Sequence, residues 1–297
     1  MVRTAFAKIN LGLHVLRRRQ DGFHDLETVF LRIGWHDELS VSPAADLSMT
    51  CSDLMLPVDQ SNLCIQAAQL VADSVAAGHV GSQADPGLTR PTHQITGAQI
   101  HLEKHLPYGA GLGGGSSDAA VTLMACNELW NANLDADELS RLASRLGSDV
   151  AFFLGGPVAF GSGKGEVLTA MEMPPALKDQ WLSVIVPLVH VSTADAYAGI
   201  VPNERSRPDL MSLVAAGSLN DWRASLVNDF ETTIFKRYPS IEAARDQLLS
   251  KGAGYAAMSG SGSSVFGVFT SEDLARNSVQ ELPKGSRSWV GRAEAAV

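Results

Sequence analysis

The chain has 297 residues, of which 45% are hydrophobic and 19% are charged, and its formal net charge is −9. These fractions are typical of a globular protein that buries its own core, and the length favours two domains. The negative net charge argues against a nucleic-acid surface, because phosphate backbones are bound by clustered Lys and Arg. No apolar run reaches the roughly 20 residues of a membrane span, so no membrane partner is expected.

The N-terminal segment and the cysteines bear on the cellular compartment. Lys8, Asn10 and His14 interrupt the apolar stretch and arginines follow it, which is the reverse of a secretory signal peptide. The three cysteines are widely spaced and include no C-x-x-C pair, so neither a disulfide framework nor a zinc site is indicated. We expect a cytoplasmic protein, and the sequence does not indicate its oligomeric state.

Residues 5–16 alternate apolar and polar side chains with the period of a β-strand. One face is apolar, whereas Lys8 and Asn10 share the opposite face with Gly12 and His14. The pattern therefore predicts a strand on which Lys8 and Asn10 point in the same direction.

A tight turn is predicted after this strand at Asp21-Gly22, a dipeptide typical of hairpins. The apolar segment 26–33 predicts a second strand that pairs with the first. Phe23 and His24 should then lie near the hairpin tip, where ligand contacts often concentrate.

Apolar spacing, together with glycine and proline breaks, predicts the remaining elements. Residues 77–95 are expected to form a long surface loop. Asp118 is expected in the first turn of the helix after the glycine-rich segment, where a carboxylate complements the helix dipole. A domain boundary between 160 and 180 divides the chain into 1–165 and 166–297. The predicted helices cover 61–76, 116–129, 135–146, 209–215 and 240–249, and the predicted strands cover 100–106, 158–160 and 182–186.

Five glycines fall within the seven residues from Gly109 to Gly115, between a predicted strand and a predicted helix. Backbone N–H groups in such a loop can approach a ligand where side chains would obstruct it. The helix adds partial positive charge at its N-terminus, and Ser116 and Ser117 offer hydroxyls to a phosphate or a magnesium ion. The segment therefore predicts a polyphosphate site, since a flexible linker rarely joins a strand directly to a helix.

Two common nucleotide-binding motifs fit this loop less well. Gly109, Gly111 and Gly114 match the dinucleotide fingerprint G-x-G-x-x-G. A Rossmann unit also needs a second strand that ends in an acidic residue about 20 residues later, whereas Asp135 and Asp137 open a predicted helix. A P-loop consensus is absent from the sequence.

Phosphoryl transfer requires positioned phosphates and charge neutralisation, and it often uses a carboxylate that orients or deprotonates the attacking hydroxyl. Lys8 and Asp149 are candidates for the last two roles. Asp149 is flanked by apolar residues, where burial would hold it rigidly beside a cation, and helix capping is the alternative role. His101 and His105 are four residues apart, but their segment is a predicted strand and lacks the H-E-x-x-H order of a metal site.

Three motifs of the chain resemble, in order, those of the GHMP family of small-molecule kinases. They are AKIN at residues 7–10, the loop at 107–120 and MSGSGSS at 258–264. The resemblance covers nearly the whole chain and implies an α+β fold of two domains, with the active site in the cleft between them and with ATP and Mg²⁺ as cofactors. The residues that it assigns to ATP binding are Pro107, Gly109, Ala110, Gly111, Leu112, Gly113, Gly114, Gly115, Ser116 and Ser117.

Longer phrases resemble family members that phosphorylate a tertiary hydroxyl of a cytidine diphosphate-linked methylerythritol. These phrases are AKINLGL (7–13), DGFHDLETVF (21–30), GAGLGGGSSDAA (109–120), GSDVAFF (147–153) and NDFE (228–231). The resemblance implies that Asp149 is the catalytic aspartate and that Lys8 pairs with it and with the transferring phosphate.

The same resemblance implies the substrate contacts. Asn10 matches a polar residue of the substrate site, and His24 matches one that contacts the cytosine. Phe23 and Tyr197 match aromatic residues that stack on the base, although tyrosine is usual at the position of Phe23. Leu188, His190 and the segment 77–95 also depart from the pattern. A kinase for another small alcohol, a nicotinamide-dependent oxidoreductase and an inactive metabolite-binding module remain as alternatives.

Overall fold

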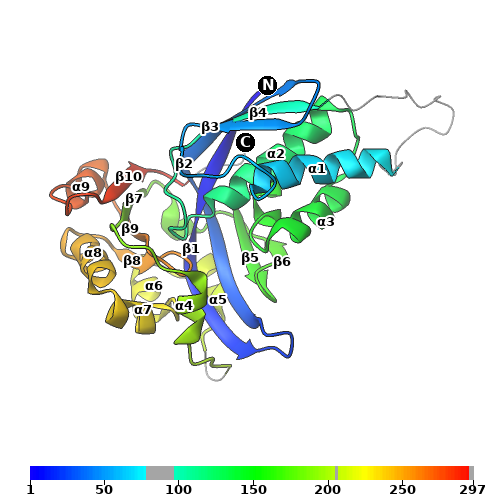
Figure 1. Cartoon of the computed structure of the whole chain (residues 1–297). Helices are drawn as coiled ribbons and strands as arrows, with labels where there is room; N and C mark the ends of the chain where they lie inside the picture. The colour runs from blue at the N-terminus through cyan, green and yellow to red at the C-terminus, as the bar shows by residue number, and fades with distance from the viewer. Residues whose placement is uncertain (78–96, 205–206, 294–297) are drawn as a thin grey trace. The chain divides into compact units, whose positions relative to one another are not determined.

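The computed structural model describes residues 1–77, 97–204 and 207–293 (Figure 1). The predicted loop over 77–95 lies outside the described residues, except for Ala77. The described part of the chain contains no helix that is long and apolar enough to cross a membrane.

The chain folds into two compact units that interleave along the sequence. The first comprises Met1–Phe6, His36–Leu106 and Gly114–Gly155, and the second comprises Ala7–Trp35, Pro107–Gly113 and Gly156–Val297. The division into two consecutive domains, 1–165 and 166–297, stays a prediction. The mixture of helices and sheets agrees with the predicted α+β class.

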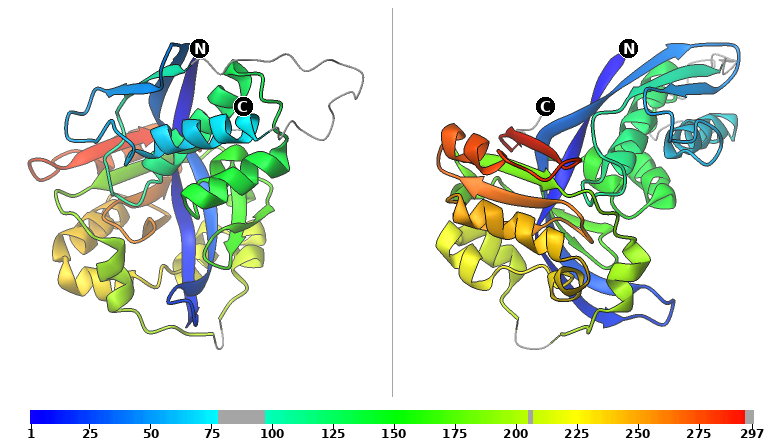
Figure 2. Two further views of the ribbon diagram at one scale, coloured as in Figure 1. Left: turned by 45° about the vertical axis from the view of Figure 1, so that its right-hand side comes forward. Right: turned by 60° about the vertical axis from the view of Figure 1, so that its left-hand side comes forward.

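A long antiparallel hairpin supplies strands to both units (Figure 2). It consists of β1 (Val2–Arg18) and β2 (His24–Pro43), and Gly22 lies in the connecting turn with a φ of 86°. The predicted strands and turn are therefore confirmed. Strand β2 continues beyond the predicted end at Ile33, because Asp37, which interrupts the apolar pattern, is fully buried and paired.

In the first unit, two strands and three helices surround the distal half of β2. β4 (Ala98–Glu103) pairs antiparallel with β2 and parallel with β3 (Ser48–Cys51). The helices are α1 (Leu63–Ala76), α2 (Gly114–Leu129) and α3 (Ala136–Leu146), and α1 packs against α2 (Figure 1). The three helices expected in this region are confirmed, and their starts differ from prediction by at most two residues.

The predicted position of Asp118 in the first turn of its helix is wrong. Helix α2 begins at Gly114, two residues earlier than the composition suggested, so Asp118 follows the first turn. Its side chain is buried and its Oδ2 atom lies 2.9 Å from Nζ of Lys104. Pairing with Lys104 in the protein interior, rather than interaction with the helix dipole, therefore explains the acidic residue at position 118.

Lys104 lies between two buried carboxylates in the first unit. Its Nζ donates to Asp37 and to Asp118, and all three side chains are at most 4% exposed. Oδ1 of Asp37 also accepts the backbone N–H of Leu106, at 2.7 Å. Burial, assisted by Asp37, raises the pKa of Asp118 to about 7, even though Lys104 acts to lower it. Three buried side chains therefore fix the chain after β4 and the start of α2.

In the second unit, the proximal half of β2 pairs antiparallel with β5 (Val158–Ser162), and β5 pairs with β6 (Val167–Ala170). A separate antiparallel sheet has the strand order β10-β7-β9-β8. Its members are β7 (Trp181–Val186), β8 (Tyr255–Met258), β9 (Val265–Phe269) and β10 (Arg287–Gly291). The helices of this unit are α4 (Thr193–Ala198), α5 (Leu210–Ala216), α6 (Leu219–Ser225), α7 (Glu231–Arg237), α8 (Pro239–Ser250) and α9 (Glu272–Ser278).

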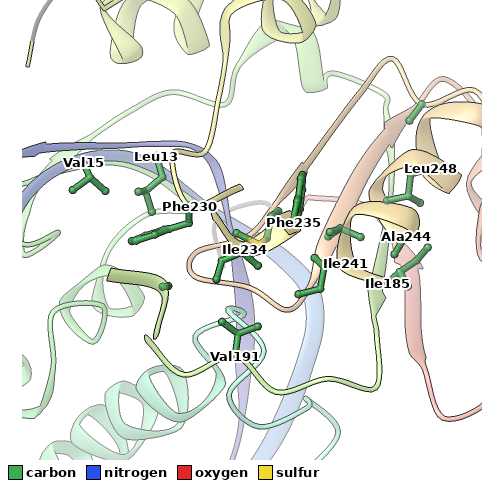
Figure 3. Close-up of a cluster of buried hydrophobic side chains, with 14 of the residues drawn as sticks. Leu13, Val15, Ile185, Val191, Phe230, Ile234, Phe235, Ile241, Ala244 and Leu248 are labelled. Atoms are coloured by element: carbon green, nitrogen blue, oxygen red, sulfur yellow. The ribbon is translucent and has the colours of Figure 1, made fainter. Parts of the chain in front are cut away.

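One hydrophobic cluster joins β1 to the helices of the second unit (Figure 3). Leu13 and Val15 of β1 pack in this cluster together with Phe230, Ile234 and Leu248. The predicted apolar face of β1 is thus buried. The opposite face is buried as well, since Lys8 and Asn10 are 3% and 2% exposed, so the polar side chains of β1 need partners inside the protein.

The raised pKa of Asp118 predicts a pH-dependent stability. The folded chain holds a proton on this carboxyl up to pH about 7, whereas its ordinary pKa is 3.8. Because the folded state binds more protons in this window, the free energy of unfolding falls as the pH rises through it. Relative to Asp118→Asn, the wild type should lose a few kcal/mol between pH values of about 4 and 8, at ~1.4 kcal/mol per pKa unit.

Urea unfolding of both proteins across this pH range measures the effect. Asp73→Asn, on the exposed side of α1, is the matched control and should keep the wild-type pH dependence. Parallel stability curves for the wild type and Asp118→Asn would contradict the assignment of the proton.

Candidate active site

The glycine-rich loop adopts backbone conformations that favour glycine. Gly109, Gly111 and Gly113 have φ values of 66°, 81° and 70°, in the left-handed region. A Cβ atom on Gly111 would lie 2.2 Å from the carbonyl oxygen of Ser259, so the loop and the Ser259 turn approach each other as backbones. The glycines therefore serve both the shape of the loop and its close packing within the second unit.

Serines of the turn at residues 259–264 bind two carbonyl groups of the loop. Oγ of Ser259 donates to the carbonyl of Gly111 at 2.8 Å. Ser264 donates to the carbonyl of Ala110 through its backbone N–H at 3.0 Å and through Oγ at 2.5 Å. These oxygens are directed at donors within the protein, so they do not face a ligand.

Strand β1 binds the next carbonyl of the loop. The backbone N–H of Lys8 donates to the carbonyl of Leu112 at 2.9 Å, and the backbone N–H of Asn10 donates to Oγ of Ser259 at 3.2 Å. The side chains of Ala110 and Leu112 are buried, so these two loop residues can offer a ligand only their backbones. The three motifs that resemble a kinase family thus form one hydrogen-bonded assembly.

Lys8 and Asn10 are neighbours, as the strand period predicted. Nζ of Lys8 donates to Oδ1 of Asn10 at 2.7 Å and lies 5.3 Å from the centroid of the Phe30 ring. Nδ2 of Asn10 donates to Oγ1 of Thr28 at 2.8 Å, and Thr28 donates to the carbonyl of Gly12 at 2.7 Å. This chain of bonds holds the Lys8 ammonium in a defined place within a buried site.

Thr28 and the serines of the turn were missed as site residues. The serines could have been found, because they alternate with glycines in MSGSGSS and their hydroxyls can bind a nearby backbone. Thr28 gave no signal, because threonine is common in strands and its partner Asn10 lies 18 residues away on β1.

Asp149 lies in the first unit, in the turn between α3 and a short 3₁₀-helix at Ala151–Leu154. The residues that follow it are buried, as predicted, whereas Asp149 itself is half-buried. Its Oδ1 atom accepts a hydrogen bond from Oγ of Ser148 at 3.3 Å. Val150, not Asp149, occupies the cap position of the 3₁₀-helix, so the alternative capping role is not supported at this helix.

The last loop residues belong to the first unit, where Gly114 and Gly115 open helix α2. Ser116 is half-buried, and Ser117 is 1% exposed. The described residues contain no group of three or more His, Cys, Asp or Glu side chains that could hold a metal ion. Oγ1 of Thr50 lies 2.8 Å from Nδ1 of His101, which is therefore engaged within the sheet.

The hairpin tip and helix α4 bring two predicted substrate residues together. The rings of His24 and Tyr197 stack at 4.8 Å between centroids and 19° between planes, and both belong to the second unit. Tyr197 also packs edge-on against Phe230, at 4.9 Å. Burial and the charge of Arg18 lower the pKa of His24, so at neutral pH its imidazole is neutral and offers one donor and one acceptor.

Phe23 makes a different contact from that of the ring pair. Its side chain is exposed, and Nζ of Lys164 lies 4.7 Å from the centroid of its ring. Phe23 and Tyr197 thus make separate contacts within the second unit.

Comparison with known proteins identifies related families and structures. The model described as GHMP kinases N terminal domain matches residues 62–157, and that described as GHMP kinases C terminal matches residues 210–286. A protein of Salinibacter ruber named 4-diphosphocytidyl-2-C-methyl-D-erythritol kinase is 41% identical, over 95% of this chain and 94% of the relative. One of Prosthecochloris aestuarii with the same name is 41% identical, over 94% and 92%.

Solved structures agree with these matches. A crystal structure of 4-(cytidine 5'-diphospho)-2C-methyl-D-erythritol kinase is 35% identical with a TM-score of 0.77, over 98% of both chains. The mevalonate kinase of Methanococcus jannaschii is 15% identical with a TM-score of 0.68, over 99% of this chain and 98% of that one, which shows a shared fold. Both halves of the sequence, and not the glycine loop alone, carry the likeness. The chain belongs to the GHMP kinase family.

Proposed function

We propose that this protein is an ATP-dependent kinase that phosphorylates the 2-hydroxyl of 4-diphosphocytidyl-2-C-methyl-D-erythritol in the non-mevalonate route to isoprenoid precursors. The observation that carries this proposal is the 41% identity, over 95% of the chain, to a relative named for that kinase activity. The hydrogen-bonded assembly of the three family motifs supports the nucleotide-binding part of this proposal.

The glycine-rich loop is suited to a nucleotide because three of its carbonyl groups accept hydrogen bonds from within the protein. Donors from β1 and from the turn at 259–264 bind the carbonyl groups of Ala110, Gly111 and Leu112. A carbonyl oxygen carries partial negative charge and would repel phosphate oxygens, whereas backbone N–H groups attract them. Holding the carbonyls inside the protein leaves the N–H side of the loop for the phosphates of ATP. We assign residues 107 and 109–117 to ATP binding on this basis and on the family resemblance.

The site fits a magnesium ion that is held mainly by the nucleotide. Magnesium prefers oxygen ligands and keeps several waters together with substrate phosphates, so it needs few protein ligands. When bound, the ion would reduce the negative charge of the triphosphate, and Ser116 and Ser117 are the hydroxyls that we assign to it. The burial of Ser117 makes Ser116 the more accessible of the two.

Lys8 and Asp149 are the residues that we assign to the chemical step. The acceptor oxygen forms a new bond to the γ-phosphorus as the bond to the β-phosphate oxygen breaks and ADP leaves. We assign Asp149 to orient the acceptor hydroxyl and to accept its proton. The Lys8 ammonium stabilises the negative charge of the transferring group, and Asn10 holds that ammonium in place.

We assign Asn10, Phe23, His24 and Tyr197 to the substrate. Aromatic rings bind any flat base by stacking, which is worth roughly 1–3 kcal/mol per base and does not distinguish cytosine from uracil. His24 is neutral and offers a donor and an acceptor, so it is suited to the edge of the base. The ring of His24 rests on that of Tyr197, so the two side chains form one stacked pair.

The first test of the chemistry is Asp149→Asn. This change keeps the shape of the side chain and removes the proton acceptor, so we expect kcat to fall by roughly two to four orders of magnitude. The dissociation constant for ATP, measured by calorimetry, should stay near that of the wild type. Asp137→Asn, on the exposed surface of α3, is the control and should keep full activity. Full activity of Asp149→Asn would remove the catalytic assignment.

The second test concerns the substrate. ADP release is measured with the cytidine-linked methylerythritol, its uridine-linked analogue, unlinked methylerythritol, homoserine and mevalonate. We expect Tyr197→Ala to lower kcat/KM for both nucleotide-linked alcohols by roughly 10-fold, as for the loss of one stacking contact. Tyr197→Phe is the control, because it keeps the ring.

His24→Ala should instead narrow the gap between the cytidine-linked and uridine-linked substrates, since an unmatched polar partner costs roughly 1–3 kcal/mol. If the wild type phosphorylates an unlinked alcohol equally well, the proposed substrate is wrong and a kinase for another small alcohol is indicated. Tight binding of NADH without ADP release would favour an oxidoreductase.

A further inference from the structure

The segment Asn228–Glu231, NDFE, is bound directly to strand β1 of the second unit. The backbone N–H of Leu13 donates to the carbonyl of Val227, and the backbone N–H of Asp229 donates to the carbonyl of Leu13, both at 2.9 Å. These two bonds form a parallel bridge between Leu13 and Asn228. The segment is therefore in register with the strand that carries Lys8 and Asn10.

Asn228 donates to two backbone carbonyl groups in the segment that binds the glycine-rich loop. Its side-chain Nδ2 atom donates to the carbonyls of Met258 and Gly260, each at 2.8 Å, and its Oδ1 atom accepts the backbone N–H of Phe230 at 3.1 Å. The residue is 2% exposed. Both N–H groups and the oxygen of the Asn228 amide are thus engaged in hydrogen bonds. The two carbonyls that accept from its N–H groups belong to the residues on either side of Ser259.

Glu231 binds the other side of the same peptide chain. Its Oε1 atom accepts the backbone N–H of Met258 at 2.7 Å, and its Oε2 atom lies 3.9 Å from Nη1 of Arg245. Asn228 therefore holds the carbonyl of Met258 while Glu231 holds its N–H. Met258 directly precedes Ser259, so both bonds help to fix the backbone from which the Ser259 side chain extends.

The connection from this segment to the phosphate loop leaves little room for adjustment. Ser259 donates to the carbonyl of Gly111 at 2.8 Å, and a Cβ atom on Gly111 would lie 2.2 Å from the carbonyl oxygen of Ser259. Backbones this close cannot shift independently, because interiors are densely packed. A displacement of Ser259 must therefore move Gly111 or break its hydrogen bond.

We propose that Asn228 and Glu231 are positioning residues for ATP, which fix Ser259 through Met258 and Gly260 and thereby hold the carbonyl of Gly111 away from the bound phosphates. This inference rests on the proposed function, since it assumes that the loop binds ATP. It does not depend on which alcohol is the acceptor.

The ionisation of Glu231 gives the proposal a pH signature. Burial, with smaller contributions from Glu242 and Asp246, raises the pKa of Glu231 to about 7, although the Met258 N–H and Arg245 act to lower it. Tyr255 of β8 also faces this carboxyl. An ionised carboxylate accepts a hydrogen bond more strongly than a neutral group does. If bound ATP strengthens the hydrogen bonds that join the loop, the turn and Glu231, thermodynamic linkage requires that ATP also favours the ionised form of Glu231.

Asn228→Asp is the sharper variant, because it keeps the side-chain shape while removing the amide donors. We expect its dissociation constant for MgATP, measured by calorimetry, to rise roughly 10- to 100-fold, as for the loss of two buried hydrogen bonds. KM for the cytidine-linked alcohol should change less than about 3-fold, since the acceptor site is not touched. Asn220→Asp, on the exposed side of α6, is the matched control. Thermal melting checks that each variant is folded.

Glu231→Gln tests the same proposal without removing the acceptor. The amide oxygen still accepts from Met258 but cannot ionise. The ratio of the ATP dissociation constants of Glu231→Gln and the wild type, taken at each pH, cancels the titration of ATP itself. We expect this ratio to rise roughly 3- to 10-fold between pH values of about 6 and 8, with a midpoint near 7. Glu172→Gln, at an exposed position, should give a flat ratio.

The outcomes separate this inference from the proposed function. A folded Asn228→Asp protein that binds ATP as tightly as the wild type would overturn the inference and leave the kinase assignment intact. If Asn228→Asp does not fold, a flat ratio for Glu231→Gln overturns the inference, and a rising ratio supports it. If the variants weaken ATP binding but the wild type does not phosphorylate the cytidine-linked alcohol, the substrate assignment fails and the inference stands.

Discussion

Hydrogen bonding of the carbonyls in the glycine-rich loop is the interaction on which the proposed ATP site depends. A glycine loop is free to present either its N–H groups or its carbonyls, and only the first choice binds an anion. In this chain, Ser259 and Ser264 of the turn and the backbone N–H of Lys8 donate to three successive carbonyls, which favours the first choice in the proposed ATP site. The glycines permit the backbone conformation of the loop. Residues far away in the sequence determine where its carbonyl groups point.

Local patterns predicted the elements well because each pattern reflects a local cause. The period of residues 5–16 placed Lys8 beside Asn10, and the turn at Asp21-Gly22 placed His24 at the hairpin tip. The start of α2 and the place of Asp118 were missed, because a buried partner, Lys104, outweighs the dipole preference of an exposed carboxylate. Thr28 and Asn228 could not be predicted as contributors, since their partners lie on other elements.

The predicted substrate residues show the same limit. The resemblance assigned His24, Phe23 and Tyr197 to the substrate, but no local pattern indicated that His24 rests on Tyr197 while Phe23 faces Lys164. Ring pairing depends on how α4 and the β5–β6 turn approach the hairpin, and no local pattern encodes that approach. Resemblance to a family indicated the residues, and the structure shows which side chains each of them contacts.

The interleaving of the two compact units limits how the chain can be divided. The backbone passes from one unit to the other after Phe6, Trp35, Leu106, Gly113 and Gly155. A single cut anywhere in the sequence therefore leaves at least one unit incomplete, and no single truncation yields one unit without segments of the other. The two units are also difficult to exchange separately by recombination, because replacing one whole unit means replacing several separate stretches of sequence at once.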